Sequence, residues 1–149
     1  MCSGDWRETA ERLYGVFRRD FILGRPHLGD RRVWHDRRIL PGESYEEGFW
    51  HLVTRDDQQS GQRLPDMERA ARLCWCRPVI EHAEAPEVTA WNAEHAGSKV
   101  RSYLWLGPQD YVVVLEPYRR RDVAMLVTAY CADGPSVKRR LWRSFANRL

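Results

Sequence analysis

Two segments in the second half of the sequence place side chains that could bind a phosphate group on a common surface. Residues 99–106 and 123–132 alternate as strands do, so that residues two apart share a face. This alternation gives one face bearing Lys99, Arg101, Tyr103, Thr128 and Tyr130. Cations attract an anion, and hydroxyl groups can hydrogen-bond to its oxygens. A phosphate-binding cleft and a solvated polar sheet face are both compatible with this pattern.

His51 is the histidine with the best case for acid–base chemistry. An imidazole can accept or donate a proton near neutral pH. His51 lies in the apolar segment 49–52, however, and a histidine in such a segment more often has a structural role. The remaining histidines lie in expected loops or in polar surroundings and are weaker candidates: His27, His35, His82 and His95.

Four strand-like runs followed by a helix are expected to position the C-terminal side chains. The runs cover residues 88–94, 99–106, 110–116 and 123–132, and their short separators predict hairpins and an antiparallel meander. The spacing of Val137, Leu141 and Phe145 predicts the closing helix. In the last strand, we expect the apolar set to face the helices: Met125, Val127, Ala129 and Cys131.

The N-terminal half is expected to be mainly helical. Apolar residues spaced by four and three predict a first helix that ends at Gly24: Trp6, Ala10, Leu13, Phe17 and Phe21. Pro65 is expected to open a second helix, which Pro78 interrupts. Residues 32–39 weakly favour a strand, and residues 45–54 fit a strand or a short helix. The sequence therefore predicts one α+β domain over residues 1–149, with helices on one face of the sheet.

The composition limits the class of protein. The chain is 43% hydrophobic with seven tryptophans and six tyrosines, which is typical of a folded domain. It has neither a long apolar run nor a basic, then apolar, N-terminus, so we expect a cytoplasmic protein with no membrane partner. The cysteines are too few for a disulfide framework and lack zinc-site spacing: Cys2, Cys74, Cys76 and Cys131. We therefore expect no metal and no cofactor.

Arginines are grouped along the chain, although the net charge is only +3. The groups are residues 31–32, 37–38, 119–121 and 138–140, while acidic residues gather in 43–47, 56–57 and 81–87. A guanidinium group can bind a phosphate through two parallel hydrogen bonds. An anionic partner explains this distribution, and so does a merely solvated face.

Short motifs in this order resemble those of phage- and prophage-encoded proteins that are grouped with the barnase–EndoU–colicin–RelE-type ribonucleases. The resemblance spans residues 45–145 and includes Pro65-Asp66 at the start of an arginine-containing helix. The other motifs are Trp50-His51-Leu52, Arg77-Pro78-Val79-Ile80-Glu81, Tyr103-Leu104-Trp105-Leu106, Asp110-Tyr111-Val112-Val113-Val114-Leu115, Thr128-Ala129-Tyr130 and Lys138-Arg139-Arg140-Leu141. Residues 1–30 match no motif of that group.

The resemblance implies a helical N-terminal half, a four-stranded antiparallel sheet and a cleft that cleaves RNA, such as transfer or messenger RNA, without a metal. It implies the following catalytic candidates: His51, Arg77, Lys99, Arg101, Thr128 and Tyr130. Bases would stack on Tyr103 and Trp105. The flanking RNA backbone would be held by Arg119, Arg120, Arg121, Lys138, Arg139 and Arg140. An antitoxin or immunity protein is an implied partner.

Two other functions fit the same expected fold. The sheet face could bind nucleic acid without cleaving it, or the domain could bind another protein, with its arginines serving only solvation. Salt-sensitive binding of intact RNA would distinguish the first from a ribonuclease. Absence of any affinity for nucleic acid at low salt would favour the second.

Overall fold

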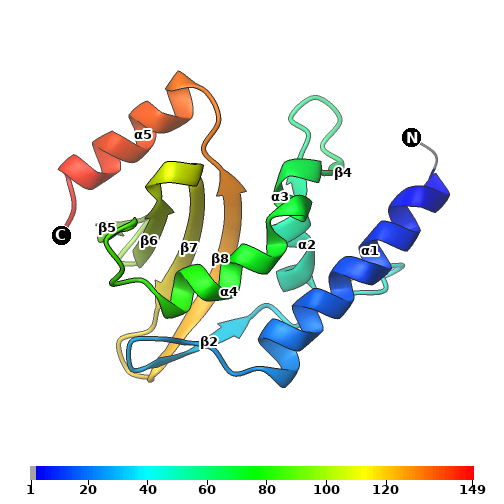
Figure 1. The fold of residues 1–149 in the computed structure, drawn as a ribbon, viewed down its shortest axis with the longest axis horizontal. Helices are drawn as coiled ribbons and strands as arrows, with labels where there is room; N and C mark the ends of the chain where they lie inside the picture. Colours follow the sequence, from blue (N-terminus) through cyan, green and yellow to red (C-terminus); the bar gives the residue numbers. More distant parts are fainter. Residues whose placement is uncertain (1–2) are drawn as a thin grey trace.

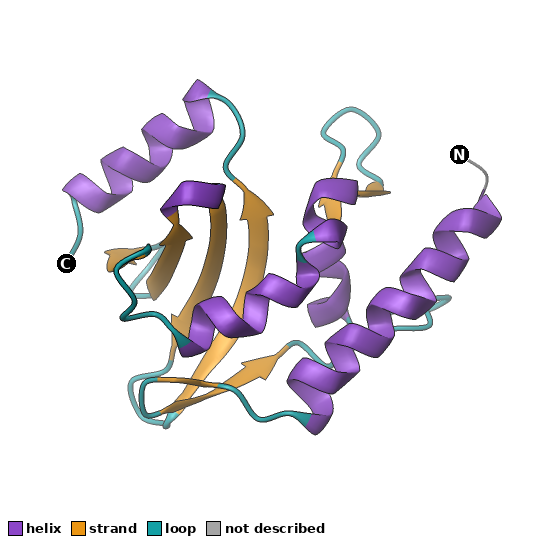
Figure 2. Ribbon diagram, viewed as in Figure 1, coloured by secondary structure: helices purple, strands orange, loops and turns teal. Residues whose placement is uncertain are grey.

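A curled, mixed sheet with helices on both faces organises the chain (Figures 1 and 2). The computed structural model describes residues 3–149, and side chains from Trp6 onward, so Cys2 lies outside the described residues. The sheet has six strands in the order β1-β2-β8-β7-β6-β5, and a separate hairpin joins β3 to β4. The predicted α+β class is therefore confirmed.

The four predicted C-terminal strands are present, but they form only part of the sheet. Strands β5 (Val88–Glu94), β6 (Val100–Leu106), β7 (Tyr111–Pro117) and β8 (Val123–Cys131) pair antiparallel in chain order. Strand β2 (Arg31–His35) extends the sheet by pairing in parallel with β8, and β1 (His27–Leu28) pairs antiparallel with β2. The predicted four-stranded sheet is thus incomplete, because the strand weakly favoured for residues 32–39 is β2 and it joins the sheet through a parallel pairing that hairpin spacing does not predict.

The N-terminal half contains strands as well as helices. Helix α1 (Ser3–Phe17) continues as a π-helical segment, η1 (Arg18–Leu23), and ends at Gly24 as predicted. Helix α2 (Glu47–Val53) follows β2 and resolves residues 45–54 as helical. The hairpin of β3 (Thr54–Asp56) and β4 (Arg63–Pro65) then leads into α3 (Met67–Ala71). The prediction of a mainly helical N-terminal half is therefore only partly confirmed, because this half also contains four short strands, β1 to β4.

The two prolines act differently from the prediction. Pro65 ends β4, and Asp66 caps α3 by accepting a hydrogen bond from the backbone N–H of Arg69. The helix breaks at Arg72 rather than at Pro78, which lies inside α4 (Leu73–Glu81). A proline inside a helix removes one backbone hydrogen bond. Here the buried face of α4 compensates, since Leu73, Cys76, Val79 and Ile80 all pack into the core.

Two hydrophobic cores lie on opposite faces of the sheet. The larger core joins α1, α2 and α4 to the sheet, and it includes the predicted stripe of α1, with Phe17 fully buried. Figure 1 shows α1 and α4 side by side on this face. The smaller core joins helix α5 (Pro135–Ala146) to Trp91 and Trp105 on the other face, and α5 uses its predicted stripe of Val137, Leu141 and Phe145. Helices therefore cover parts of both faces, not one face as predicted.

A β-bulge in β8 changes which side chains share a face. Val114 pairs with Thr128 while Leu115 pairs with Leu126, so Val127 is an extra residue with no partner on β7. An extra residue reverses the alternation of side chains along a strand. Ala124, Leu126 and Ala129 consequently belong to the larger core, whereas Val127 packs with the α5 core. The prediction that Met125 and Val127 face the same helices as Ala129 is wrong for this reason.

None of the helices among residues 3–149 combines the length and the hydropathy needed to cross a bilayer.

Candidate functional site

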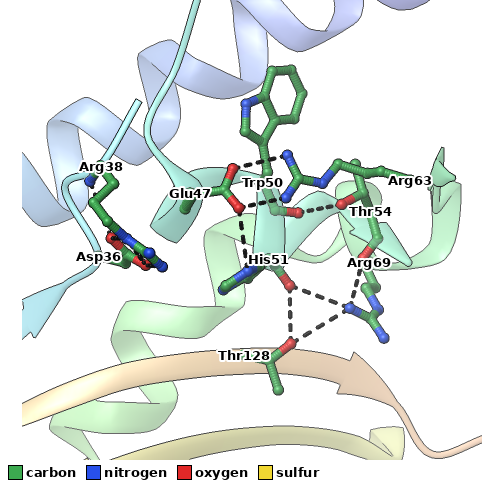
Figure 3. A network of polar contacts seen from close by, with 9 residues as sticks. All are labelled: Asp36, Arg38, Glu47, Trp50, His51, Thr54, Arg63, Arg69 and Thr128. Atoms are coloured by element: carbon green, nitrogen blue, oxygen red, sulfur yellow. Dashed lines mark hydrogen bonds and ion pairs between the residues drawn. The ribbon is translucent and has the colours of Figure 1, made fainter. Parts of the chain in front are cut away.

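Helix α2 meets the sheet where β8 loses its parallel partner. Strand β2 pairs with β8 only from Val123 to Leu126, and beyond this point α2 and α3 lie beside β8. The bulge at Val127 is followed by Thr128, whose Oγ1 donates a 2.9 Å hydrogen bond to the backbone carbonyl of His51. The structure thus brings His51 to the sheet face that carries Thr128 (Figure 3).

Arg69, a residue that sequence reasoning missed, ties this junction together. Its Nη1 donates to the backbone carbonyls of Thr54, at 2.7 Å, and His51, at 3.2 Å, and lies 3.5 Å from Thr128 Oγ1. Its Nε lies 3.3 Å from the carboxylate of Asp66. Its guanidinium carbon is 5.9 Å from the ring centroid of Tyr130. The only signal in the sequence is that Arg69 follows the capping residue Asp66 by three positions.

The imidazole of His51 lies near two carboxylates, and each carboxylate is held by an arginine (Figure 3). Its Nε2 is 3.9 Å from Oε1 of Glu47, one helical turn earlier, and its side chain is 42% exposed. Two hydrogen bonds from Arg63, at 2.7 and 3.0 Å, are the main reason that the pKa of buried Glu47 is lowered. Hydrogen bonds from Arg38 likewise lower the pKa of Asp36, and the nearby charge of His51 lowers it further.

Two adjoining cavities open beside this junction. The first has a volume of about 270 Å³, and His51, Arg55, Arg69 and Thr128 are among the residues that line it. The second, of about 550 Å³, shares Arg69 and Thr128 with the first, and Tyr130 also lines it. A ligand that spans both cavities would therefore contact the imidazole at one end and the phenol at the other.

The second cavity offers hydrogen-bond donors to an anion. Burial raises the pKa of Tyr130 to about 12, so the phenol keeps its proton at neutral pH and can donate it in a hydrogen bond. Arg140 of α5 and Tyr103 of β6 line the same cavity. Tyr103 stacks on Trp91 with its ring centroid 5.2 Å away, which fixes its orientation. Arg140 and Tyr130 thus converge with Arg69, although α5, β8 and α3 are distant in sequence.

Acidic residues form another part of the second cavity. Asp66, Glu68 and Asp133 all line it. A hydrogen bond with Asp133 is the main cause that raises the pKa of Glu68. The cavity therefore presents carboxyl groups as well as cations.

The remaining catalytic candidates lie elsewhere. Lys99 and Arg101 line a separate groove with Trp34, and Arg101 is 3.8 Å from Glu116. Arg77 pairs with Glu81 at 3.0 Å within α4, and it extends toward η1, where it contacts the backbone carbonyl of Asp20. The structure does not bring Arg77 to either cavity, because α4 presents it on the side of the larger core.

The proposed nucleic-acid contacts are also dispersed. Trp105 is only 5% exposed beneath Trp142, so its ring is not free to stack on a base. Lys138 pairs with Asp110 at 2.9 Å, and Arg139 is exposed on α5. The turn that contains Arg119, Arg120 and Arg121 borders a third region, next to Lys99.

Within residues 3–149, no group of three or more His, Cys, Asp and Glu side chains is arranged to hold a metal ion.

The Thr128 hydroxyl is expected to position His51. Thr128→Val keeps the shape of the side chain but removes the donor to the His51 carbonyl. We expect a loss of about 1 kcal/mol in the free energy of unfolding and a shift of the His51 imidazole resonances in NMR spectra. The matched control is Thr89→Val on β5, because Thr89 forms no side-chain hydrogen bond among the described residues. It should change neither the free energy of unfolding nor the His51 resonances. Unmoved His51 resonances in Thr128→Val would contradict this role.

The ion pair of Glu47 and Arg63 is expected to contribute stability that depends on pH. Because the folded-state pKa of Glu47 is lowered, this stability is present above its unfolded pKa and is lost as the pH falls through the folded value. Glu47→Gln should therefore cost about 2 kcal/mol at pH 7, and the difference from the unsubstituted protein should shrink in acid. Urea denaturation across this pH range measures it. Glu81→Gln, at an exposed pair, is the matched control; an equal loss there would contradict the prediction.

Comparison with models of protein families, with curated proteins and with solved structures finds no significant match to this chain.

Proposed function

We propose that this chain is a metal-independent endoribonuclease, the activity implied by its resemblance to the barnase–EndoU–colicin–RelE-type group. The observation that supports this best is the pair of adjoining cavities joined by Arg69 and Thr128. His51 lies at one end, and Tyr130 and Arg140 lie at the other. A titratable group next to a set of anion-binding donors is the minimal equipment for cleaving a phosphodiester without a metal.

The reaction proposed is an internal transfer of the phosphoryl group. A base removes the proton of the ribose 2′-OH, and the oxygen attacks the adjacent phosphorus. The bond from phosphorus to the 5′-oxygen then breaks, and an acid protonates that oxygen. The products are a 2′,3′-cyclic phosphate and a 5′-hydroxyl. His51 would be one of the two proton-transfer groups, because its side chain is exposed at the first cavity.

The reaction also requires stabilisation of the negative charge that develops on the phosphoryl oxygens. Arg69 and Arg140 can supply positive charge, and Tyr130 can donate a hydrogen bond. This assigns to Arg69 and Arg140 the role that sequence reasoning gave to Lys99, Arg101 and Arg77. The hydroxyl of Thr128 already donates to the His51 carbonyl, so we assign it a positioning role.

The acid or base that complements His51 would come from the second cavity. Glu68 and Asp133 both line this cavity. A carboxyl group within reach of the reacting oxygens can act as a general acid or base. The natural substrate in this proposal is a transfer or messenger RNA in the cytoplasm, and an antitoxin or immunity protein would restrain the activity.

A non-catalytic domain that binds nucleic acid or protein is the competing function. One observation favours it: Nε2 of His51 lies 3.9 Å from Glu47, which is beyond hydrogen-bond distance, and Glu47 is already bonded to Arg63. The imidazole is then oriented less firmly than in most acid–base dyads. Binding of a substrate often shortens such catalytic distances.

Replacement of His51 tests the proposal directly. In excess EDTA, His51→Ala should cleave RNA about 10²- to 10⁴-fold more slowly than the unsubstituted protein. Because the side chain is 42% exposed and its structural bonds come from the backbone, the fold should be retained. Circular dichroism and gel analysis of transfer and total RNA measure the two properties.

The matched control is His82→Ala, which removes an exposed imidazole at the end of α4, away from both cavities. It should cleave normally. Equal activity of His51→Ala and the unsubstituted protein would refute the role of His51. Activity that disappears in EDTA would refute the metal-independent reaction.

A further inference from the structure

A third cavity, of about 860 Å³, lies on the same face of the sheet, on the other side of the bulge. Its walls come from β2, from the segment that follows β2, from β6 and from β8. Arg101 shares a face of β6 with Tyr103, which lines the second cavity. Trp34 is paired in register with Met125, and both line the third cavity. We call this cavity the basic groove.

The basic groove carries more positive charge than its neighbours neutralise. Five cations line it: Arg32, Arg37, Arg38, Lys99 and Arg101. The single acidic residue lining it, Asp36, is bonded by Arg38 at 2.7 Å, and Arg101 is near Glu116. Within the described part of the chain, the side chains of Arg32, Arg37 and Lys99 form no ion pair. The groove therefore carries a net positive charge, which would attract an anion with several charges.

One end of the basic groove lies near the proposed active site. Asp36 and Arg38 line the groove, and Figure 3 shows them beside His51 and Glu47. At its other end, the groove shares Lys99 and Tyr118 with a cavity of about 460 Å³ that Arg119, Arg120 and Arg121 also line. Cations thus line the surface from Arg38, near His51, to the turn between β7 and β8.

The far wall of the basic groove is held in place by one arginine. Nη1 of Arg31 donates to the backbone carbonyls of Tyr118, Arg121, at 2.8 Å, and Val123, at 3.3 Å. These bonds fasten the turn that contains the three arginines to β2. A site whose backbone is fixed in advance loses less entropy when a ligand binds.

Aromatic groups accompany the charge. Trp34 and Tyr118 line the basic groove and are both partly exposed. The indole Nε1 of Trp34 is buried with no hydrogen-bond partner in the described structure. Cations interleaved with aromatic rings are typical of grooves that bind single-stranded nucleic acid, where phosphates meet the cations and bases stack on the rings.

We propose that the basic groove binds the phosphodiester backbone of single-stranded RNA on one side of the cleaved bond. This inference rests on the proposed function for the identity of the nucleic acid. It explains the positions of Lys99 and Arg101, which lie outside the two cavities of the active site.

The test measures binding of a non-cleavable ligand. A fluorescent, 2′-O-methylated RNA of about 12 nucleotides matches the span of such grooves. Arg32→Gln with Arg37→Gln should weaken its binding about tenfold or more, as measured by fluorescence anisotropy. Each phosphate contact contributes about 0.7 to the slope of log affinity against log salt for a single strand. Two lost contacts should therefore reduce the slope by about 1.4.

The matched control is Arg7→Gln with Arg12→Gln, which removes the same charge from exposed positions on α1. It should bind like the unsubstituted protein. Three results would each overturn the inference. The groove variant could bind the RNA as tightly as the unsubstituted protein, the control could lose as much affinity as the groove variant, or the protein could prefer duplex to single-stranded RNA. If the groove substitutions weaken RNA binding but the unsubstituted protein never cleaves RNA, the proposed function is overturned and the RNA-binding role of the groove is supported.

Discussion

The hydrogen bond from Thr128 to the His51 carbonyl depends on a change of partner along β8. The first half of β8 pairs with β2, and the second half has α2 and α3 beside it. The bulge at Val127 stands at this change and turns Thr128 toward α2. Arg69 then bonds to the same carbonyl and to that of Thr54. Without the bulge, the alternation of β8 would direct a different set of side chains toward the imidazole.

This junction also divides the face of the sheet into separate regions. Helix α5 covers the β5–β7 end of the face, where Trp91 and Trp105 are buried beneath it. Two cavities remain between α5, α3 and α2, and the basic groove lies on the other side of the bulge. The tryptophans thus hold α5, and with it Arg140, against the sheet.

The sequence predicted elements better than it predicted the arrangement of side chains. The strands of residues 88–131 and the helical stripes that contain Phe17 and Leu141 follow from local periodicity. The prediction of which β8 side chains share a face was wrong because Val127 is an inserted residue. Apolar residues occur on both faces of this strand, so the sequence pattern does not reveal the insertion. Arg69 and Arg77 are both arginines in predicted helical segments, yet only Arg69 faces the cavities. This difference depends on how α3 and α4 pack against the sheet. Such packing is not encoded in spacing alone.

The central claim is that a 2′-hydroxyl attacks phosphorus at this site without a metal. A DNA oligonucleotide that contains one ribonucleotide isolates this step, because only one bond in it can be cleaved by internal attack. In EDTA, we expect cleavage only on the 3′ side of the ribonucleotide, leaving a 2′,3′-cyclic phosphate, and none when its 2′-oxygen is methylated. Cleavage of the methylated strand, or an intact ribonucleotide-containing strand with the folded protein in excess, would contradict the account.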